Sequence, residues 1–98
     1  MSHVVSLTPE QLKQQAKVYI EACEMVRAAN QKVKNTNNEM ATQWKGKAFE
    51  KYLVQYEQLN KSIVAFENLL IDINNQCCKY ADIVAQRDID DQRAFGLQ

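Results

Sequence analysis

Residues 41–47 read Ala-Thr-Gln-Trp-Lys-Gly-Lys and contain Gly46, the only glycine in the interior of this 98-residue chain. The whole sequence has only two Gly and one Pro. A β-sandwich or an α/β domain needs many tight turns, and such turns depend on Gly, Pro, Asn and Asp. The composition therefore favours long helices with one or two connections, and Gly46 places a link at residues 42–46. A short link between two long helices forces them into an antiparallel hairpin.

The segment before the link predicts a helix over about residues 8–41. It starts with Thr8 as the N-cap, Pro9 in the first turn, and Gln11 where a capping box needs it. Apolar side chains then recur every seven residues, at Leu12, Tyr19, Val26, Val33 and Met40. Four residues further on in each heptad, a companion line reads Ala16, Cys23, Asn30 and Asn37. We interpret its two Asn residues as ordinary polar positions near the end of a bundle rather than as a polar network.

The segment after the link has the stronger pattern and predicts a helix over about residues 47–88. One heptad line contains Phe49, Tyr56, Ile63, Leu70, Cys77 and Val84. The other contains Tyr52, Leu59, Phe66, Ile73 and Tyr80 before it breaks at Arg87. Two such lines are typical of a helix that packs along a long seam. Because acids gather in residues 88–91, we expect the regular helix to end there and residues 89–98 to form a flexible tail.

The chain has more apolar residues than one hairpin seam can cover. A second line of the first helix contains Val18, Ala22, Met25 and Ala29, and the second helix keeps Leu53, Val64, Leu69 and Ile83 outside its main lines. Apolar stripes on two sides of a helix require more than one neighbour. We therefore predict an all-α, single-domain helical hairpin over residues 1–98 that dimerises into an elongated four-helix bundle. The residues expected to pack the hairpin and the dimer are Leu12, Tyr19, Val26, Val33, Met40, Phe49, Tyr52, Tyr56, Leu59, Ile63, Phe66, Leu70 and Ile73.

Composition and charge exclude several classes of function. The formal net charge is zero, so a basic surface for nucleic acid is not expected. No apolar run is long enough to span a membrane, and residues 1–10 lack the basic and apolar regions of a cleaved signal peptide. The three cysteines, Cys23, Cys77 and Cys78, are interpreted as buried thiols of a protein that folds in a reducing cytoplasm. Neither a metal site nor a cofactor is expected.

An enzymatic function is also not expected. His3 is the only histidine, so no catalytic set of Ser, His and Asp or of Cys and His can be built around it. The paired acids Asp90 and Asp91 lie in a segment expected to be exposed rather than in a pocket that could support catalysis. Burial of Cys77 would make its thiol unreactive. The sequence therefore favours a protein that acts by binding other proteins.

Trp44-Lys45-Gly46, placed at the only break between two heptad helices in a chain of about 100 residues, resembles the signature of the WXG100 (ESAT-6-like) family. The opening Leu7-Thr8-Pro9-Glu10-Gln11-Leu12 is similar to the start of Gram-positive members from Firmicutes. The resemblance implies a substrate of a type VII secretion system. Such proteins are exported as folded dimers without a cleaved signal peptide, and they engage an FtsK/SpoIIIE-type membrane ATPase.

The resemblance also implies an export signal. Mycobacterial-type members carry a Tyr followed by an acid four residues later, whereas Tyr80 is followed by Val84 at that position. The pattern of Firmicutes members is matched by Val84, Asp88 and Phe95, and Asp91 departs from it where an apolar residue is usual. Our hypothesis is that Trp44 and Gly46 of one chain and Val84, Asp88 and Phe95 of its partner form this signal together.

Two other functions stay open at this point. The first is a helical adaptor or chaperone that forms a heterodimer with a larger type VII toxin, because the seam could accept a WXG100-like partner as well as a second copy. The second is a membrane-active effector. A membrane interaction is not favoured, because the polar faces mix Glu, Gln, Asn and Lys without a basic surplus.

Overall fold

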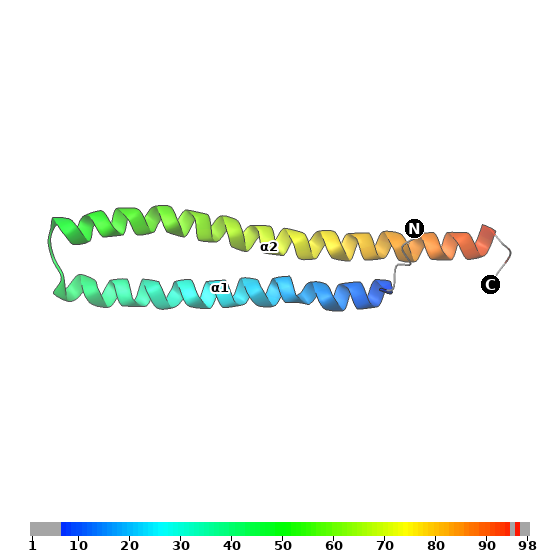
Figure 1. Ribbon diagram of the computed structural model, residues 1–98, viewed down its shortest axis with the longest axis horizontal. Helices are drawn as coiled ribbons and strands as arrows, with labels where there is room; N and C mark the ends of the chain where they lie inside the picture. Colours follow the sequence, from blue (N-terminus) through cyan, green and yellow to red (C-terminus); the bar gives the residue numbers. More distant parts are fainter. Residues whose placement is uncertain (1–6, 95, 97–98) are drawn as a thin grey trace, which may run out of the picture.

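The protein is a hairpin of two long helices (Figure 1). A computed structural model describes residues 7–94 and residue 96. Helix α1 spans Pro9–Gln43 and helix α2 spans Lys47–Ala94. They run antiparallel, side by side, and give a molecule about 75 Å long and 23 Å wide. The all-α helical hairpin predicted from the sequence is confirmed, and no strand occurs among the described residues.

The start of α1 has the capping box that the sequence predicts. The Gln11 backbone N–H donates to the Thr8 hydroxyl at 3.1 Å, and the Thr8 backbone N–H donates to the Gln11 side-chain oxygen at 2.9 Å. Pro9, which has no N–H to satisfy, occupies the first helical position. The N-cap Thr8, the capping-box partner Gln11 and Pro9 thus define the start of α1 together. The helix begins at Pro9, one residue after the predicted start at about residue 8.

The turn between the helices consists of residues 44–46. Trp44 is extended, with φ −104° and ψ 101°, and its N–H donates to the Met40 carbonyl at 2.6 Å, which closes α1. Gly46 has φ +140°, a conformation that L side chains rarely adopt, and its carbonyl accepts the Glu50 N–H at 3.1 Å to begin α2. Gly46 is therefore required here for backbone conformation.

Helix α2 continues past Asp88 to Ala94, so the predicted end near residue 88 is wrong, and residues 89–94 are helical rather than a tail. No Gly or Pro interrupts the segment before Gly96, and Gln86 donates to Asp90 along the helix at 3.0 Å. Arg93 lies in the last turn, where a cation complements the helix dipole. Gly96, at φ +72°, donates to the Arg93 carbonyl at 3.1 Å and ends the helix.

The seam between the helices is made of small or polar residues on α1 and larger ones on α2. The buried residues of α1 are Ala16, Cys23, Asn30 and Asn37, which is the companion line of the sequence pattern. The buried residues of α2 are Phe49, Tyr56, Glu67, Leu70 and Ala81. The large apolar line of α1 lies at the edge of this seam and outside it, with Leu12, Val26 and Met40 half-buried and Tyr19 and Val33 exposed.

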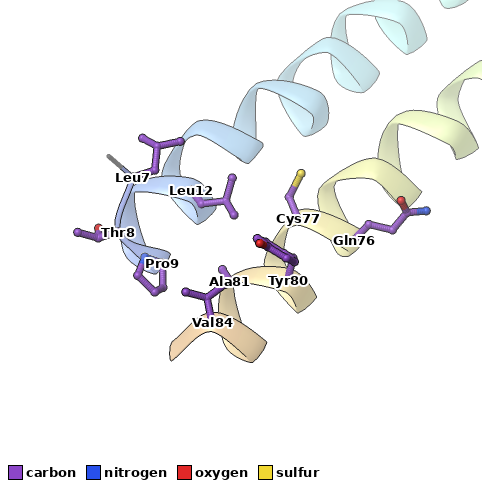
Figure 2. A pocket seen from close by; sticks show the side chains of 9 residues that line it. All are labelled: Leu7, Thr8, Pro9, Leu12, Gln76, Cys77, Tyr80, Ala81 and Val84. Atoms are coloured by element: carbon purple, nitrogen blue, oxygen red, sulfur yellow. The ribbon is translucent and has the colours of Figure 1, made fainter. Parts of the chain in front are cut away.

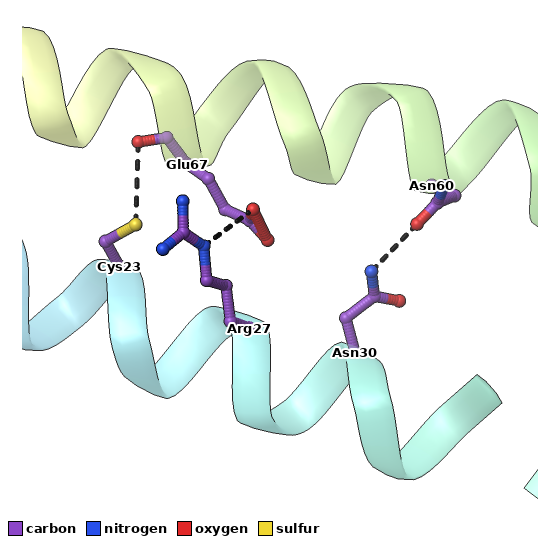
Figure 3. A network of polar contacts seen from close by, with 5 residues as sticks. All are labelled: Cys23, Arg27, Asn30, Asn60 and Glu67. Carbon is purple, nitrogen blue, oxygen red and sulfur yellow. Dashed lines mark hydrogen bonds and ion pairs between the residues drawn. The ribbon is translucent and has the colours of Figure 1, made fainter. Parts of the chain in front are cut away.

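The buried Asn residues form a network with tyrosines, so our interpretation of them as ordinary bundle-end positions is wrong. Asn30 donates to the Asn60 side-chain oxygen at 2.8 Å and accepts a hydrogen bond from the Tyr56 hydroxyl. Figure 3 shows the first of these contacts crossing between the helices. Nearer the turn, the Tyr52 hydroxyl donates to Asn37 at 3.0 Å. Burial raises the pKa of Tyr56, which stays protonated as the donor that Asn30 needs.

Charged contacts join the helices further along the seam. Glu67, buried in α2, accepts a hydrogen bond from Arg27 Nε at 3.3 Å, and its backbone carbonyl accepts from the Cys23 thiol at 3.7 Å (Figure 3). Near the open end of the hairpin, the Lys13 ammonium lies 2.5 Å from Asp82. The hydrogen bond and the charge of Asp82 raise the pKa of Lys13. These contacts set the register of α1 against α2.

The Asn30 contacts generate a stability prediction. Asn30→Ala leaves the buried Tyr56 hydroxyl without its acceptor, so we expect the free energy of unfolding to fall by about 1–3 kcal/mol. Asn38→Ala is the matched control, because Asn38 is exposed on the same helix and gains the same helix propensity. Urea unfolding at one fixed protein concentration measures both. Equal stability of the two variants would contradict a structural role for Asn30.

The turn generates a second prediction. A Cβ added at Gly46 meets no atom within 4 Å, so Gly46→Ala tests backbone strain alone. We expect it to lower the free energy of unfolding by about 1–3 kcal/mol. The control is Gly96→Ala, which also has positive φ but lies beyond the end of α2. We expect it to fray the last turn with little change in global stability, measured by urea unfolding and by amide exchange. A neutral Gly46→Ala would show that the turn tolerates a side chain.

Candidate protein–protein interface

One long side of the hairpin carries large apolar side chains that no helix covers. We call it the apolar face and define it by the following residues: Leu12, Tyr19, Val26, Val33 and Met40 of α1, and Tyr52, Leu59, Ile63, Phe66, Ile73 and Tyr80 of α2. Shallow hollows along it are lined by both helices together, for example by Val26 and Val33 with Leu59 and Ile63. Leu59 is 55% exposed and Phe66 49%. Contiguous exposed apolar surface of this kind marks an interaction site.

The heptad residues predicted to pack the hairpin and dimer fall into three groups. Phe49, Tyr56 and Leu70 are buried in the seam. Those that are half-buried, at the edge between seam and apolar face, are Leu12, Val26, Met40, Tyr52, Ile63 and Ile73. Those that are exposed on the apolar face are Tyr19, Val33, Leu59 and Phe66. The hairpin by itself therefore buries only a minority of the residues that the heptad pattern singles out.

Aromatic rings connect the turn to the apolar face. Trp44 is 45% exposed, and its ring packs on Phe49 with centroids 5.1 Å apart at an interplanar angle of 44°. Phe49 in turn stacks on Tyr52 at 6.1 Å. One side of the indole is thus covered by its own chain, while much of the rest is open. An indole with a free apolar face and an N–H donor suits contact with another protein.

The opposite, open end of the hairpin has an apolar pocket of about 440 Å³, shown in Figure 2. We call it the end pocket. Its walls come from the start of α1 and the later part of α2: Leu7, Thr8, Pro9, Leu12, Gln76, Cys77, Tyr80, Ala81 and Val84. The sequence pattern did not identify this pocket. The one sequence signal for it is the spacing of Leu7 and Leu12, which is that of a hydrophobic staple.

The residues predicted to form the export signal lie at the two ends of the molecule. Trp44 and Gly46 form the turn, whereas Val84 lines the end pocket and Asp88 is exposed beyond it on α2. Phe95 lies outside the described residues. Asp91, the position that departs from the family pattern, is exposed and helical. Within one chain the two halves of the signal are separated by most of the length of the hairpin.

Other kinds of site find little support among the described residues. No group of three or more His, Cys, Asp or Glu is arranged to hold a metal ion in residues 7–94 and 96. Cys23 is buried as expected, but Cys77 and Cys78 are only half-buried. Neither α1 nor the described part of α2 has a stretch long and apolar enough to cross a membrane.

Comparison with known proteins gives a consistent result. The family model for proteins of 100 residues with a Trp-x-Gly motif, WXG100, matches residues 5–89. An uncharacterized protein of Clostridium acetobutylicum is 52% identical over 93 residues, which cover 95% of this chain and 97% of that protein. The type VII secretion system extracellular protein A of Staphylococcus aureus is 27% identical over 95 residues, or 97% of this chain and 98% of its own. With this match over most of its length, the chain belongs to the WXG100 family.

Proposed function

We propose that this protein is a substrate of a type VII secretion system, exported as a folded homodimer and acting outside the cell through protein–protein interaction. Membership of the WXG100 family and a relative named as an extracellular type VII secretion protein support the export route. The route implies no cleaved signal peptide and an FtsK/SpoIIIE-type ATPase as the membrane partner. The single observation that carries the dimer is the apolar face.

The apolar face is self-complementary when one copy is turned end over end. A two-fold axis at Val26 places each large residue of the α1 line opposite a large residue of the same line in the other copy. Leu12 then faces Met40, Tyr19 faces Val33, and the two Val26 side chains face each other. An axis at Phe66 does the same for α2, with Tyr52 opposite Tyr80 and Leu59 opposite Ile73. The contacts of Glu67 with Arg27 and Cys23 put Val26 and Phe66 at nearly the same level. One axis can therefore serve both helices.

Such an antiparallel dimer would bring the two halves of the export signal together. The turn of one copy, with Trp44 and Gly46, would lie beside Val84 and Asp88 of the other, and Phe95 comes seven residues after Asp88 in the sequence. Each end of the four-helix bundle would then carry one complete, composite surface. We propose that the secretion ATPase recognises this surface, which a monomer cannot present.

The dimer proposal predicts a change in oligomeric state. Leu59→Glu places a carboxylate within the apolar face, and burial of an unpaired charge costs several kcal/mol, so the dimer dissociation constant should rise by about a hundredfold or more. Val54→Glu is the control, because Val54 is 63% exposed on the same helix and lines none of the hollows of the face. Sedimentation velocity over a dilution series measures both. A wild-type chain that is a folded monomer, or that aggregates until another WXG100-like protein is added, would favour the adaptor or heterodimer function instead.

The export proposal predicts loss of secretion without loss of fold. Trp44→Ala and Asp88→Ala should accumulate in cells of a Gram-positive host with a type VII system, and their level in the medium should fall to that of a cytoplasmic marker. Asp90→Ala is the matched control for Asp88→Ala, since both acids are exposed on the same stretch of α2. Circular dichroism of each purified variant checks the fold. Normal secretion of both Trp44→Ala and Asp88→Ala would rule out their role in the signal.

A further inference from the structure

We infer that the side chain of Val5 fills the end pocket of its own chain, so that the segment before α1 closes the open end of the hairpin. Residues 1–6 precede the part of the chain that the structure describes, and they read Met-Ser-His-Val-Val-Ser. The proposed contact lies within one chain. It is therefore independent of the homodimer and of the export route proposed above.

The end pocket is apolar and open to solvent. Its volume is about 440 Å³, and Figure 2 shows Leu7 and Leu12 on its α1 side and Tyr80 and Val84 on its α2 side. Tyr80 is 54% exposed and Leu7 36%, so both leave apolar surface in water. An aliphatic side chain that covers this surface stabilises the protein, because the removal of apolar surface from water is favourable.

The start of α1 brings the preceding residues to the edge of this pocket. Leu7, the first described residue, is itself part of the pocket wall. Leu7 and Leu12 have the spacing of a hydrophobic staple, which fixes the angle at which the chain enters a helix. Thr8, between Leu7 and the first residue of α1, has the extended conformation, with φ −74° and ψ 160°. The chain therefore enters α1 at the pocket and with an extended backbone.

The alternation of side chains along an extended backbone selects Val5 over Val4. Successive side chains point to opposite sides, so an extended backbone before Leu7 would place Val5 on the side of Leu7 and Val4 on the other side. Two extended residues span about 7 Å, and the axes of packed helices are about 8–10 Å apart. Val5 can therefore reach from the wall at Leu7 to the wall at Tyr80 and Val84.

The apolar residues that follow α2 cannot reach the end pocket. Val84 lies in the pocket wall, and Ala94, the last residue of α2, is about 15 Å further along the helix at 1.5 Å per residue. Phe95 follows directly, and Leu97 follows Ala94 by three residues, which span at most about 11 Å. The segment before α1 is therefore the part of this chain outside the described residues that can occupy the pocket.

The contact is tested by NMR on the full-length protein with isotope-labelled valine methyl groups. We expect a nuclear Overhauser effect between the Val5 methyl groups and the Tyr80 ring, assigned through its loss in Val5→Ser. Val4→Ser is the matched control, because it removes the same atoms from the neighbouring residue and should leave this signal in place. An isotope-filtered spectrum of mixed labelled and unlabelled chains distinguishes a contact within one chain from a contact between two copies.

Amide hydrogen exchange gives a second and independent measurement. Val5→Ser removes apolar cover from the start of α1, so we expect the amides of Leu12 and of the following turn to exchange about tenfold faster than in the wild type. Val4→Ser should leave their exchange rates unchanged. Circular dichroism of both variants checks that the two helices are retained.

Three outcomes would overturn the contact. The first is a wild-type spectrum in which Val5 shows no contact with Tyr80, whether Val4 takes its place or the pocket stays open. The second is a contact seen only between labelled and unlabelled chains, which would show that a second copy occupies the pocket. The third is equal exchange rates in Val5→Ser and Val4→Ser. None of them bears on the proposed homodimer or export route, which the Leu59→Glu and Trp44→Ala variants test separately.

Discussion

The structure depends on one packing constraint: the fully buried positions of α1 are all held by small or polar side chains. Ala16, Cys23, Asn30 and Asn37 occupy the α1 side of the seam, opposite aromatic and aliphatic residues of α2. These residues fill the centre of the seam, and the large residues of α1 lie at its edge or outside it, where they form part of the apolar face. The same constraint that closes the hairpin therefore leaves it with a large unpaired surface.

Polar contacts give this seam its specificity more than its strength. A satisfied hydrogen bond contributes only about 0.5–1.5 kcal/mol net, whereas leaving a buried partner unsatisfied costs about 1–3 kcal/mol. The main effect of these contacts is therefore to disfavour other registers of α1 against α2. Asn30 is hydrogen-bonded to both Asn60 and Tyr56, and Glu67 is hydrogen-bonded to Arg27. A slip by one turn would bury each of these groups without its partner. Apolar burial, at about 25 cal/mol per Å², must supply most of the stability, and much of the apolar surface is on the uncovered face.

The sequence predicted the elements well because their signals are local. Thr8, Pro9 and Gln11 specify the start of α1 through contacts within one turn, and Gly46 marks the link because no other interior residue tolerates its φ. The choice of seam was not predictable in this way. Both heptad lines of α1 have the same period, and which one turns inward depends on the partner side chains on α2. The acids of residues 88–91 do not end α2, because Arg93 in the last turn and the contact of Gly96 with the Arg93 carbonyl stabilise the helix beyond them.

The unequal lengths of the helices separate a structural part of α2 from a free one. With 48 residues against 35, α2 extends past the start of α1, and Figure 1 shows its last turns with no helix beside them. These turns contain Asp88 and the 44%-exposed Ile89, and they rely on contacts within the helix, such as Gln86 with Asp90. Their exposed side chains make no contact that the hairpin needs, so these side chains are available to bind another protein. A rigid helix with such a surface loses little conformational entropy on binding, which suits a segment that another protein must recognise.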